Sequence, residues 1–287
     1  LTSGATAGIT DSGTVTVGGN LVATTDANSG VINLDSMAVD GTFTLSPHST
    51  GAVTVVNDAG LDLAASTMGG TFSGTATTGN ISDAGALAIT GAATFITGAT
   101  GSNIILDVAS NAFSNSVEMR ADDGSEAFGN ITFVDSAAVD FDSSASANGD
   151  LFINASTDGA VGGNLNVTAT TGSITQNTAL TVTGTTTLTT SANDATITLN
   201  NTSNAFTGAM TITTNDASGD VTIDGGTTAL NIGASTIDGD LTVTSDNASG
   251  ITDSGTVTVG GNLVATTDGN NGVIDLGTTT VTGTMDL

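Results

Sequence analysis

Apolar and small polar residues alternate along most of the chain. Runs at 14–17, 180–183 and 241–244 place Val, Leu or Ile at every second position, with Thr between them. A period of two gathers the apolar side chains on one face, so these runs predict β-strands with one buried face. Gly, Asn, Asp and Ser separate the runs and favour turns. No stretch shows helical periodicity, so the pattern predicts an all-β protein.

One stretch of the sequence occurs twice. Residues 8–26 and 250–268 are identical, 242 positions apart, and two divergent copies lie between them. Aligned on their first Ile, the four copies begin near residues 9, 81, 174 and 251. Each has Gly ten residues later and Ile-x-Leu from the twenty-third residue onward. The second and third copies also share Ser-Asn-Ala-Phe, at 110–113 and 203–206. Self-similarity of this kind is typical of stacked repeat architectures.

The spacing of the copies predicts a coil length. The intervals are 72, 93 and 77 residues, and the longest exceeds the shortest by 21, about one coil of a β-solenoid. We therefore expect a right-handed parallel β-helix (β-solenoid) of about 15 coils of roughly 18–21 residues, stacked about 4.8 Å apart and without caps. Residues 1–287 would form a single continuous solenoid, least regular at 113–152, where five of the nine Phe lie. A β-sandwich is the alternative, but it needs bulkier core residues.

The segment at 179–213, ALTVTGTTTLTTSANDATITLNNTSNAFTGAMTIT, resembles the β-helical repeats of large bacterial exoproteins. These are the filamentous-haemagglutinin-type adhesins and related giant surface proteins. The resemblance covers nearly the whole chain and lies in composition and spacing. It implies a right-handed parallel β-helix, an extracellular location, secreted or at the bacterial cell surface, and repeats without catalytic residues.

Charge narrows the choice of partners. The chain has 28 acidic residues, one Arg, Arg120, and no Lys, which gives a net charge of −27. Such a chain repels phosphate backbones and anionic lipid headgroups, so we expect no nucleic-acid partner. No apolar run reaches the length of a membrane span, so we expect no membrane insertion. The chain has no Cys and therefore no disulfide.

Carboxylates supply the candidate chemistry. Glu118, Asp122, Asp123 and Glu126 lie close together in sequence, and Ca²⁺ prefers oxygen ligands, so they form a candidate calcium site. A solvated acidic surface is the plainer interpretation, and no cofactor is expected to be required. The best carboxylate pairs for glycoside hydrolysis are Asp140 with Asp142, which share a strand face, and Asp122 with Asp123. Tyr and Trp are absent, however, and the single His, His48, stands in a turn.

These observations predict a non-catalytic structural component of an extracellular or cell-surface fibre or stalk, adhesin-like in role. A calcium- or ligand-binding surface module is the alternative, and a cell-surface or glycan ligand is a candidate partner. A polysaccharide-active enzyme is less favoured. Ice binding through the recurrent Thr-x-Thr pairs is also less favoured, because coils such as 139–141 interrupt them.

The two ends of the sequence align with the interior of the repeat. The first residues match the strand at 243–245, and the last seven match residues 39–45. We therefore expect a segment of a longer repetitive protein. End-to-end or lateral self-association of separate copies is the alternative to continuation of the same chain.

Overall fold

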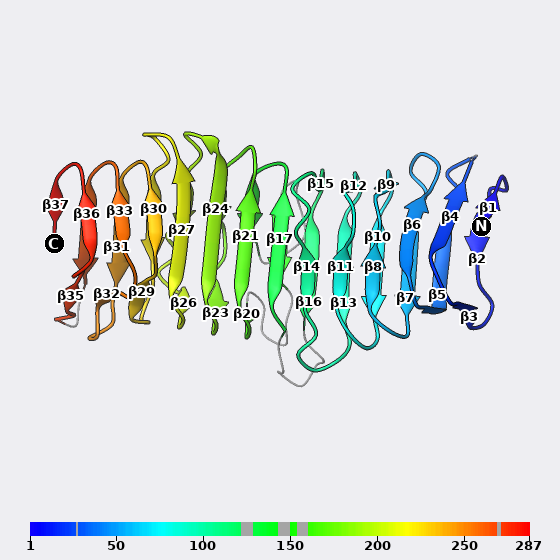
Figure 1. The fold of residues 1–287 in the computed structure, drawn as a ribbon, viewed down its shortest axis with the longest axis horizontal. Coiled ribbons are helices and arrows are strands. Elements are labelled where there is room, and N and C mark those ends of the chain that lie inside the picture. Colours follow the sequence, from blue (N-terminus) through cyan, green and yellow to red (C-terminus); the bar gives the residue numbers. More distant parts are fainter. Residues whose placement is uncertain (27, 122–128, 143–149, 154–159, 269–270) are drawn as a thin grey trace. The chain divides into compact units, whose positions relative to one another are not determined.

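The computed structural model describes the chain except for residues 27, 122–128, 143–149, 154–159 and 269–270. Every regular element in the described part is a β-strand (Figure 1). Contacts divide the chain into two units, one of Leu1–Ser136 with Ser144–Asp158 and one of Ala137–Ser143 with Gly159–Leu287. No helix suited to crossing a membrane occurs among the described residues.

In the first unit the strands form two long faces and a shorter third side, and they pair in parallel. The first face contains β1 (Thr2–Ser3), β4 (Leu21–Thr25), β6 (Thr42–Ser46), β8 (Leu61–Leu63), β11 (Ile81–Asp83), β14 (Ile104–Leu106) and β17 (Ile131–Asp135). The second contains β2 (Ile9–Thr10), β5 (Ile32–Val39), β7 (Val53–Asn57), β10 (Phe72–Ala76), β13 (Ala93–Thr97), β16 (Val117–Ala121) and β19 (Asp150–Ile153). The third side contains β9 (Ser66–Met68), β12 (Leu87–Ile89) and β15 (Ala112–Phe113), and β3 (Val15–Val17) pairs with β5.

The second unit also has two long faces, but its short strands form two separate rows, β20-β23-β26 and β30-β33-β36. Its first face contains β21 (Leu165–Ala169), β24 (Thr186–Asn193), β27 (Met210–Asn215), β29 (Leu230–Ile232), β32 (Ile251–Asp253) and β35 (Ile274–Asp275). Its second contains β18 (Val139–Phe141), β22 (Ile174–Gln176), β25 (Ile197–Leu199), β28 (Val221–Asp224), β31 (Leu241–Ser245), β34 (Leu263–Thr267) and β37 (Met285–Asp286). The short strands are β20 (Ala160–Val161), β23 (Thr181–Val182), β26 (Ala205–Phe206), β30 (Ser235–Ile237), β33 (Val257–Val259) and β36 (Thr279–Val281).

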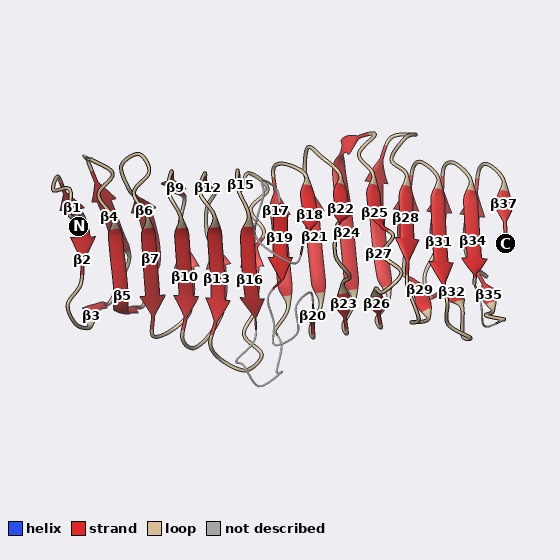
Figure 2. Cartoon of the chain, turned by 180° about the vertical axis from the view of Figure 1, so that it is seen from behind, coloured by secondary structure: helices blue, strands red, loops and turns tan. Residues whose placement is uncertain are grey.

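Each unit is a parallel β-solenoid, as the repeats predict. Within the first unit, Figure 2 shows β7, β10, β13 and β16 in front, pointing down, while the chain advances to the right from one to the next. Figure 1, seen from the other side, shows β4 and β6 pointing up. Chain that descends on the near face and ascends on the far face while advancing to the right winds as a right-handed helix.

The predicted coil number was too high because the coils are longer than expected. In the first unit Ile32, Val53, Phe72, Ala93 and Val117 lie in register on successive strands of the second face. This column advances by about 21 residues per coil, and the column from Ile174 to Met285 in the second unit advances by about 22. The chain therefore has about 12 coils, not about 15.

Two strand pairings join residues that lie unusually far apart in the sequence. Val117 pairs with Leu151 in the first unit, and Val139 pairs with Ile174 in the second. Each of these steps takes about half as many residues again as the average coil. The two stretches overlap at residues 139–151, because β18 precedes β19 along the chain, so they are not two separate lengthened coils. The expected irregularity at 113–152 is confirmed.

The core is a narrow column of stacked apolar side chains. Alternate residues of each long strand point inward, and β7, β10 and β13 show strict buried–half-buried alternation. Phe72, Phe95, Phe113 and Phe133 stack across successive coils of the first unit, with ring centroids 5.1, 6.1 and 5.2 Å apart. These rings fill the interior where Val, Ile and Leu fill it elsewhere.

A threonine hydroxyl closes the turn after several long strands. In each case the residue that ends or nearly ends the strand donates to the carbonyl five residues later. The pairs are Thr25–Gly30 (2.9 Å), Thr97–Ser102 (3.5 Å), Thr190–Ala195 (3.1 Å), Thr214–Gly219 (2.7 Å) and Thr267–Gly272 (3.2 Å). The hydroxyl satisfies a carbonyl that the strand ladder leaves at the corner.

Two buried threonines on β24 predict opposite responses to the same substitution. Thr186 and Thr190 are both 1% exposed, but only the Thr190 hydroxyl has a partner. Thr186→Val removes a buried, unpaired hydroxyl and should raise the free energy of unfolding by about 1 kcal/mol. Thr190→Val leaves the Ala195 carbonyl unpaired and should lower it by about 1–3 kcal/mol. Chemical denaturation measures both values, and equal effects of the two substitutions would contradict this interpretation.

Candidate functional site

The third residue of each repeat copy holds a loop of the next coil. The side-chain oxygen at this position accepts a hydrogen bond from a backbone N–H one coil further along the chain. The pairs are Asp11–Ser36 (2.8 Å), Asp83–Asp107 (2.9 Å), Gln176–Asn201 (3.0 Å) and Asp253–Thr278 (2.8 Å). The repeated Ile-x-Asp/Gln of the sequence therefore supplies a hydrogen bond between successive coils. We call this contact the clamp.

The second repeated marker, the Asn of Ser-Asn-Ala-Phe, contacts this clamp directly. The buried Asn111 donates from Nδ2 to Asp83 at 2.6 Å, and its Oδ1 accepts from the Leu87 N–H at 2.9 Å. Asn204 repeats both contacts, donating to Gln176 at 2.9 Å and accepting from the Leu180 N–H at 2.9 Å. Two positions that lie more than a coil apart in sequence thus form one buried polar network.

The clamp carboxylates differ in electrostatic environment. Burial raises the pKa of Asp83 above its ordinary value, although the hydrogen bonds from Asn111, Asp107 and Val108 act in the opposite direction. Partial desolvation also opposes ionisation of Asp253, but hydrogen bonds from the Thr278 side chain and backbone and from neighbouring groups together hold its pKa below the ordinary value. The pKa values of equivalent residues of the repeat are thus shifted in opposite directions.

Asn and Asp side chains form a second set of coil-to-coil contacts at two corners: Asn20, Asn80, Asn103 and Asn164 precede strands of the first face, and Asp220, Asp240 and Asn262 precede strands of the second. Each side-chain oxygen accepts from a backbone N–H on the next coil. The pairs are Asn20–Thr42 (3.0 Å), Asn80–Asn103 (2.9 Å), Asn103–Asn130 (2.7 Å), Asn164–Thr185 (2.8 Å), Asp220–Asp240 (2.8 Å), Asp240–Asn262 (2.6 Å) and Asn262–Thr284 (2.9 Å). A Cβ on residue 184 would overlap Asn164 and the Gly163 backbone, so this position requires Gly.

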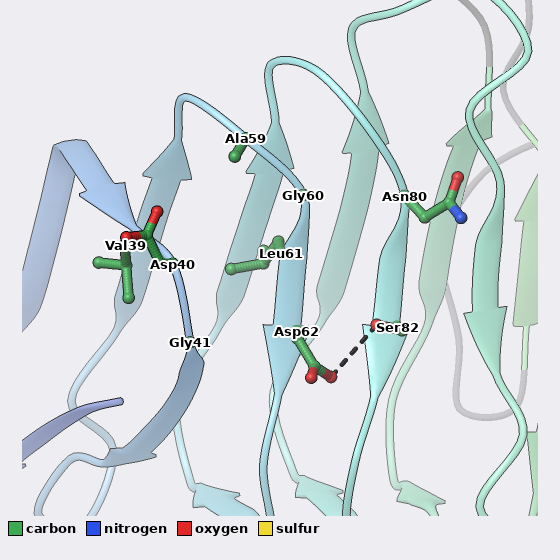
Figure 3. A pocket seen from close by; sticks show the side chains of 9 residues that line it. All are labelled: Val39, Asp40, Gly41, Ala59, Gly60, Leu61, Asp62, Asn80 and Ser82. Atoms are coloured by element: carbon green, nitrogen blue, oxygen red, sulfur yellow. Dashed lines mark hydrogen bonds between the residues drawn. The ribbon is translucent and has the colours of Figure 1, made fainter. Parts of the chain in front are cut away.

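A shallow surface depression lies beside the corner that contains Asn80, in the first unit (Figure 3). Asp40, Asp62, Asn80 and Ser82 supply its polar groups, and the Ser82 hydroxyl donates to Asp62 at 3.2 Å. Asn80 is already engaged with the Asn103 N–H. The lining contains carboxylates, an amide and a hydroxyl but no imidazole or cationic side chain. The Ser82 hydroxyl therefore has a carboxylate partner but no imidazole beside it.

The predicted calcium site lies mostly outside the described residues. Asp122, Asp123 and Glu126 fall within 122–128. Glu118 is described, on β16, where its Oε2 lies 3.5 Å from the Thr94 hydroxyl. Within the described ranges, no three His, Cys, Asp or Glu side chains are grouped to hold a metal ion. Calcium binding therefore stays a prediction.

The carboxylate pair considered for glycoside hydrolysis is engaged in hydrogen bonds. Asn177 Nδ2 donates to Asp140 at 2.7 Å and to Asp142 at 3.3 Å, and the Thr175 hydroxyl donates to Asp140 at 2.9 Å. These contacts join β18 to the next coil of the second unit.

The predicted turn residue His48 is exposed, and its backbone N–H donates to Thr25 Oγ1 at 2.8 Å.

A column of six threonines crosses the second unit, and sequence reasoning missed it. Thr168, Thr189, Thr213, Thr236, Thr258 and Thr280 lie in register on successive strands. Thr-x-Thr spacing within single strands does not reveal this column, because part of it runs through the short strands β30, β33 and β36. The signal was present in the sequence as a Thr that recurs once per coil.

Asp83 and Asp253 should give opposite pH dependences. The pKa of Asp83 is higher in the folded protein than its ordinary value of 3.8. Asp83 therefore stabilises the fold at pH values below 3.8, and this contribution is lost as pH rises through the folded-state pKa. The pKa of Asp253 is lower in the folded protein than 3.8. Asp253 therefore stabilises the fold at pH values above 3.8, and this contribution is lost as pH falls through the folded-state pKa. The destabilisation caused by Asp83→Asn should therefore shrink as pH rises, and that caused by Asp253→Asn should grow. Chemical denaturation of both variants and the unsubstituted chain between about pH 3 and 6 measures the two slopes, and slopes of the same sign would contradict the assignment.

Comparison with known proteins yields one family. No curated protein matches the chain, and no solved structure matches it. One family model, described as repeats of unknown function (DUF5649), matches residues 50–120, 128–213 and 218–280, well over half of the chain. The three matched segments succeed one another along the sequence, as expected for a repeat protein. The chain belongs to this family of repeats, DUF5649.

Proposed function

We propose that this chain is a non-catalytic structural segment of an extracellular or cell-surface fibre or stalk, adhesin-like in role. The family carries no assigned activity, so the proposal depends on how the chain uses its polar groups and on how its repeats join. Its chemical work is to hold coils together by hydrogen bonds around a thin apolar core.

One observation carries the proposal: the repeated block returns to the same register. Thr2 pairs with Thr24 and Ser3 with Thr25 in the first unit. The matching residues in the second unit, Thr244 with Thr266 and Ser245 with Thr267, pair in the same way. Ile9–Ile32 and Ile251–Ile274 likewise repeat the same pairing across a coil of the same length. A block that ends in the register in which it begins can be joined to further blocks without a change of coil geometry.

The use of the polar side chains supports the same conclusion. The repeated Asp, Gln and Asn residues bond to the neighbouring coil, so the sequence repeats preserve stacking contacts and leave little for a reaction centre. The outer faces present Thr, Ser and acidic residues, which keep strand surfaces soluble. A solenoid with these properties lengthens a fibre and presents its outer faces to the surroundings.

A tandem chain tests whether blocks extend the solenoid. Residues 1–268 followed directly by residues 27–287 reproduce the natural junction, because residues 8–26 and 250–268 are identical. Small-angle X-ray scattering should show a maximum dimension that roughly doubles at an unchanged cross-sectional radius, because coils add along one direction.

The matched control shifts the junction. A chain of residues 1–268 followed by 35–287 has almost the same composition but removes eight residues of a coil. It should lose cooperative unfolding or show a bend at the junction. A tandem chain with a wider cross-section, or a tandem and control that behave alike, would refute block-wise extension.

The location is tested separately. Antibodies raised against the chain should label intact cells of the source organism, and protease added to intact cells should remove the label. Label that appears only after the cells are permeabilised would refute the extracellular role.

A further inference from the structure

The corner contacts of the first face are interrupted in the first unit. Asn80 and Asn103 each use a side-chain oxygen to accept a backbone N–H of the next coil, at 2.9 and 2.7 Å. One coil before Asn80, the same position holds Gly60, because Leu61 pairs with Ile81 in register. Glycine has no side chain that could accept from the Asn80 N–H. The row of Asn side chains therefore begins at Asn80, and the space beside Gly60 is part of the surface depression.

A backbone hydrogen bond that joins the following coils is also missing at this place. The Leu61 N–H donates to the Asn80 carbonyl at 2.9 Å. By register, the equivalent bond one coil earlier would run from the Gly41 N–H to the Gly60 carbonyl. Within the described ranges these two groups bond elsewhere: the Gly41 N–H donates to the preceding coil at 3.2 Å, and the Gly60 carbonyl accepts from Asn57 Nδ2 at 2.7 Å. The depression lies where this bond is missing, and both glycines line it.

The depression contains hydrogen-bond donors and acceptors together. Among the described residues, the Gly60 N–H has no hydrogen-bond partner. Asp40 is exposed, and Asp62 supplies a second carboxylate, to which the Ser82 hydroxyl donates at 3.2 Å (Figure 3). Since the Ser82 proton is directed at Asp62, the Ser82 oxygen can still accept a hydrogen bond. One backbone donor and three side-chain acceptors thus line the same depression.

This combination of groups favours an uncharged ligand. Two carboxylates repel an anion, and so does the net charge of −27. A metal cation is attracted by the carboxylates, but it has no acceptor to offer to the Gly60 N–H. A hydroxyl group both donates and accepts, so neighbouring hydroxyls of one ligand can donate to a carboxylate and accept from an N–H at the same time. Hydrogen bonds to an ionised carboxylate are the stronger kind.

We propose that the depression at Gly41 and Gly60 binds an uncharged sugar. Its hydroxyl groups donate to Asp40 and Asp62 and accept from the Gly60 N–H. The depression is shallow and offers few polar groups, so the dissociation constant for a single sugar ring is on the order of 1–10 mM. This binding goes beyond the proposed structural role and does not depend on it.

Nuclear magnetic resonance of the isotopically labelled chain tests the site residue by residue. The chain is titrated with methyl glucoside, methyl galactoside and N-acetylglucosamine, at a salt concentration that screens the net charge. At least one of these sugars should shift the amide resonances of Gly60, Asp62 and Ser82, and the shifts should saturate. If none of the three shifts the Gly60 resonance, or if Ca²⁺ shifts it and the sugars do not, the proposal is wrong.

Gly60→Asn should close the site. The new side chain occupies the position that Asn80 and Asn103 occupy on the next coils, and its oxygen can accept from the Asn80 N–H. A Cβ on residue 60 would lie 3.0 Å from the Asn80 carbonyl oxygen, so the backbone needs to move by only a few tenths of an ångström. The variant should therefore fold and bind the sugar at least tenfold more weakly. Unchanged binding by the folded variant would overturn the proposal.

A pair of charge-matched variants decides the question independently of that substitution. Asp62→Asn removes one carboxylate from the depression and should raise the dissociation constant about tenfold. Asp240→Asn makes the same change of charge at a corner position of the second unit, where Asn262 fills the equivalent place. It should leave binding unchanged, and equal effects of the two variants would contradict the assignment. Neither result affects the tandem-chain test, which measures the joining of blocks.

Discussion

The parallel hydrogen-bond ladder between coils is the interaction on which the rest of the structure depends. A single coil of about 20 residues is too small to bury its apolar side chains alone, and only stacking encloses them. Stacking also demands that the backbone groups at the corners find partners, since the strands end there. Thr190, Asn111 and Asn164 meet this demand from three different positions of the coil. The polar residues of the repeat are thus as much a part of the stack as its aliphatic ones.

The same demand helps to account for the composition. The corner groups left by parallel strands include many backbone N–H donors, and a side chain that pairs with them must accept. Asp, Asn, Gln, Ser and Thr can do so, whereas Lys and Arg carry donors only. The clamps at Asp11, Asp83 and Asp253 and the corner contacts at Asp220 and Asp240 are filled by such acceptors. Part of the chain's negative charge therefore follows from the geometry of its corners.

The strands, the solenoid class and the four copies could be predicted from the alternation of apolar residues, because burial on one face leaves a direct trace in sequence. Coil length could not, because it depends on turns whose length the strand pattern does not limit: the step from Ala93 to Val117 is longer than the step from Val53 to Phe72. The contact between Asp83 and Asn111 was visible only as two separate repeated letters. The two residues meet only because successive coils stack in register. The calcium candidates beyond Glu118 fall outside the described residues, and carboxylates close in sequence give no information about their distances in space.

The coil-by-coil ladder has a mechanical consequence. A pull along the stacking direction loads the coil interfaces in series with the same force, and the hydrogen bonds of a parallel pair oppose it together before they separate. Each interface that yields releases a coil of about 20 residues, which extends to roughly 70 Å. Under tension such a chain lengthens in steps and gives up its outermost coils first, while the remaining coils keep their stacking contacts. A molecule built this way dissipates force locally and retains the structure on which its coils can stack again when the load falls.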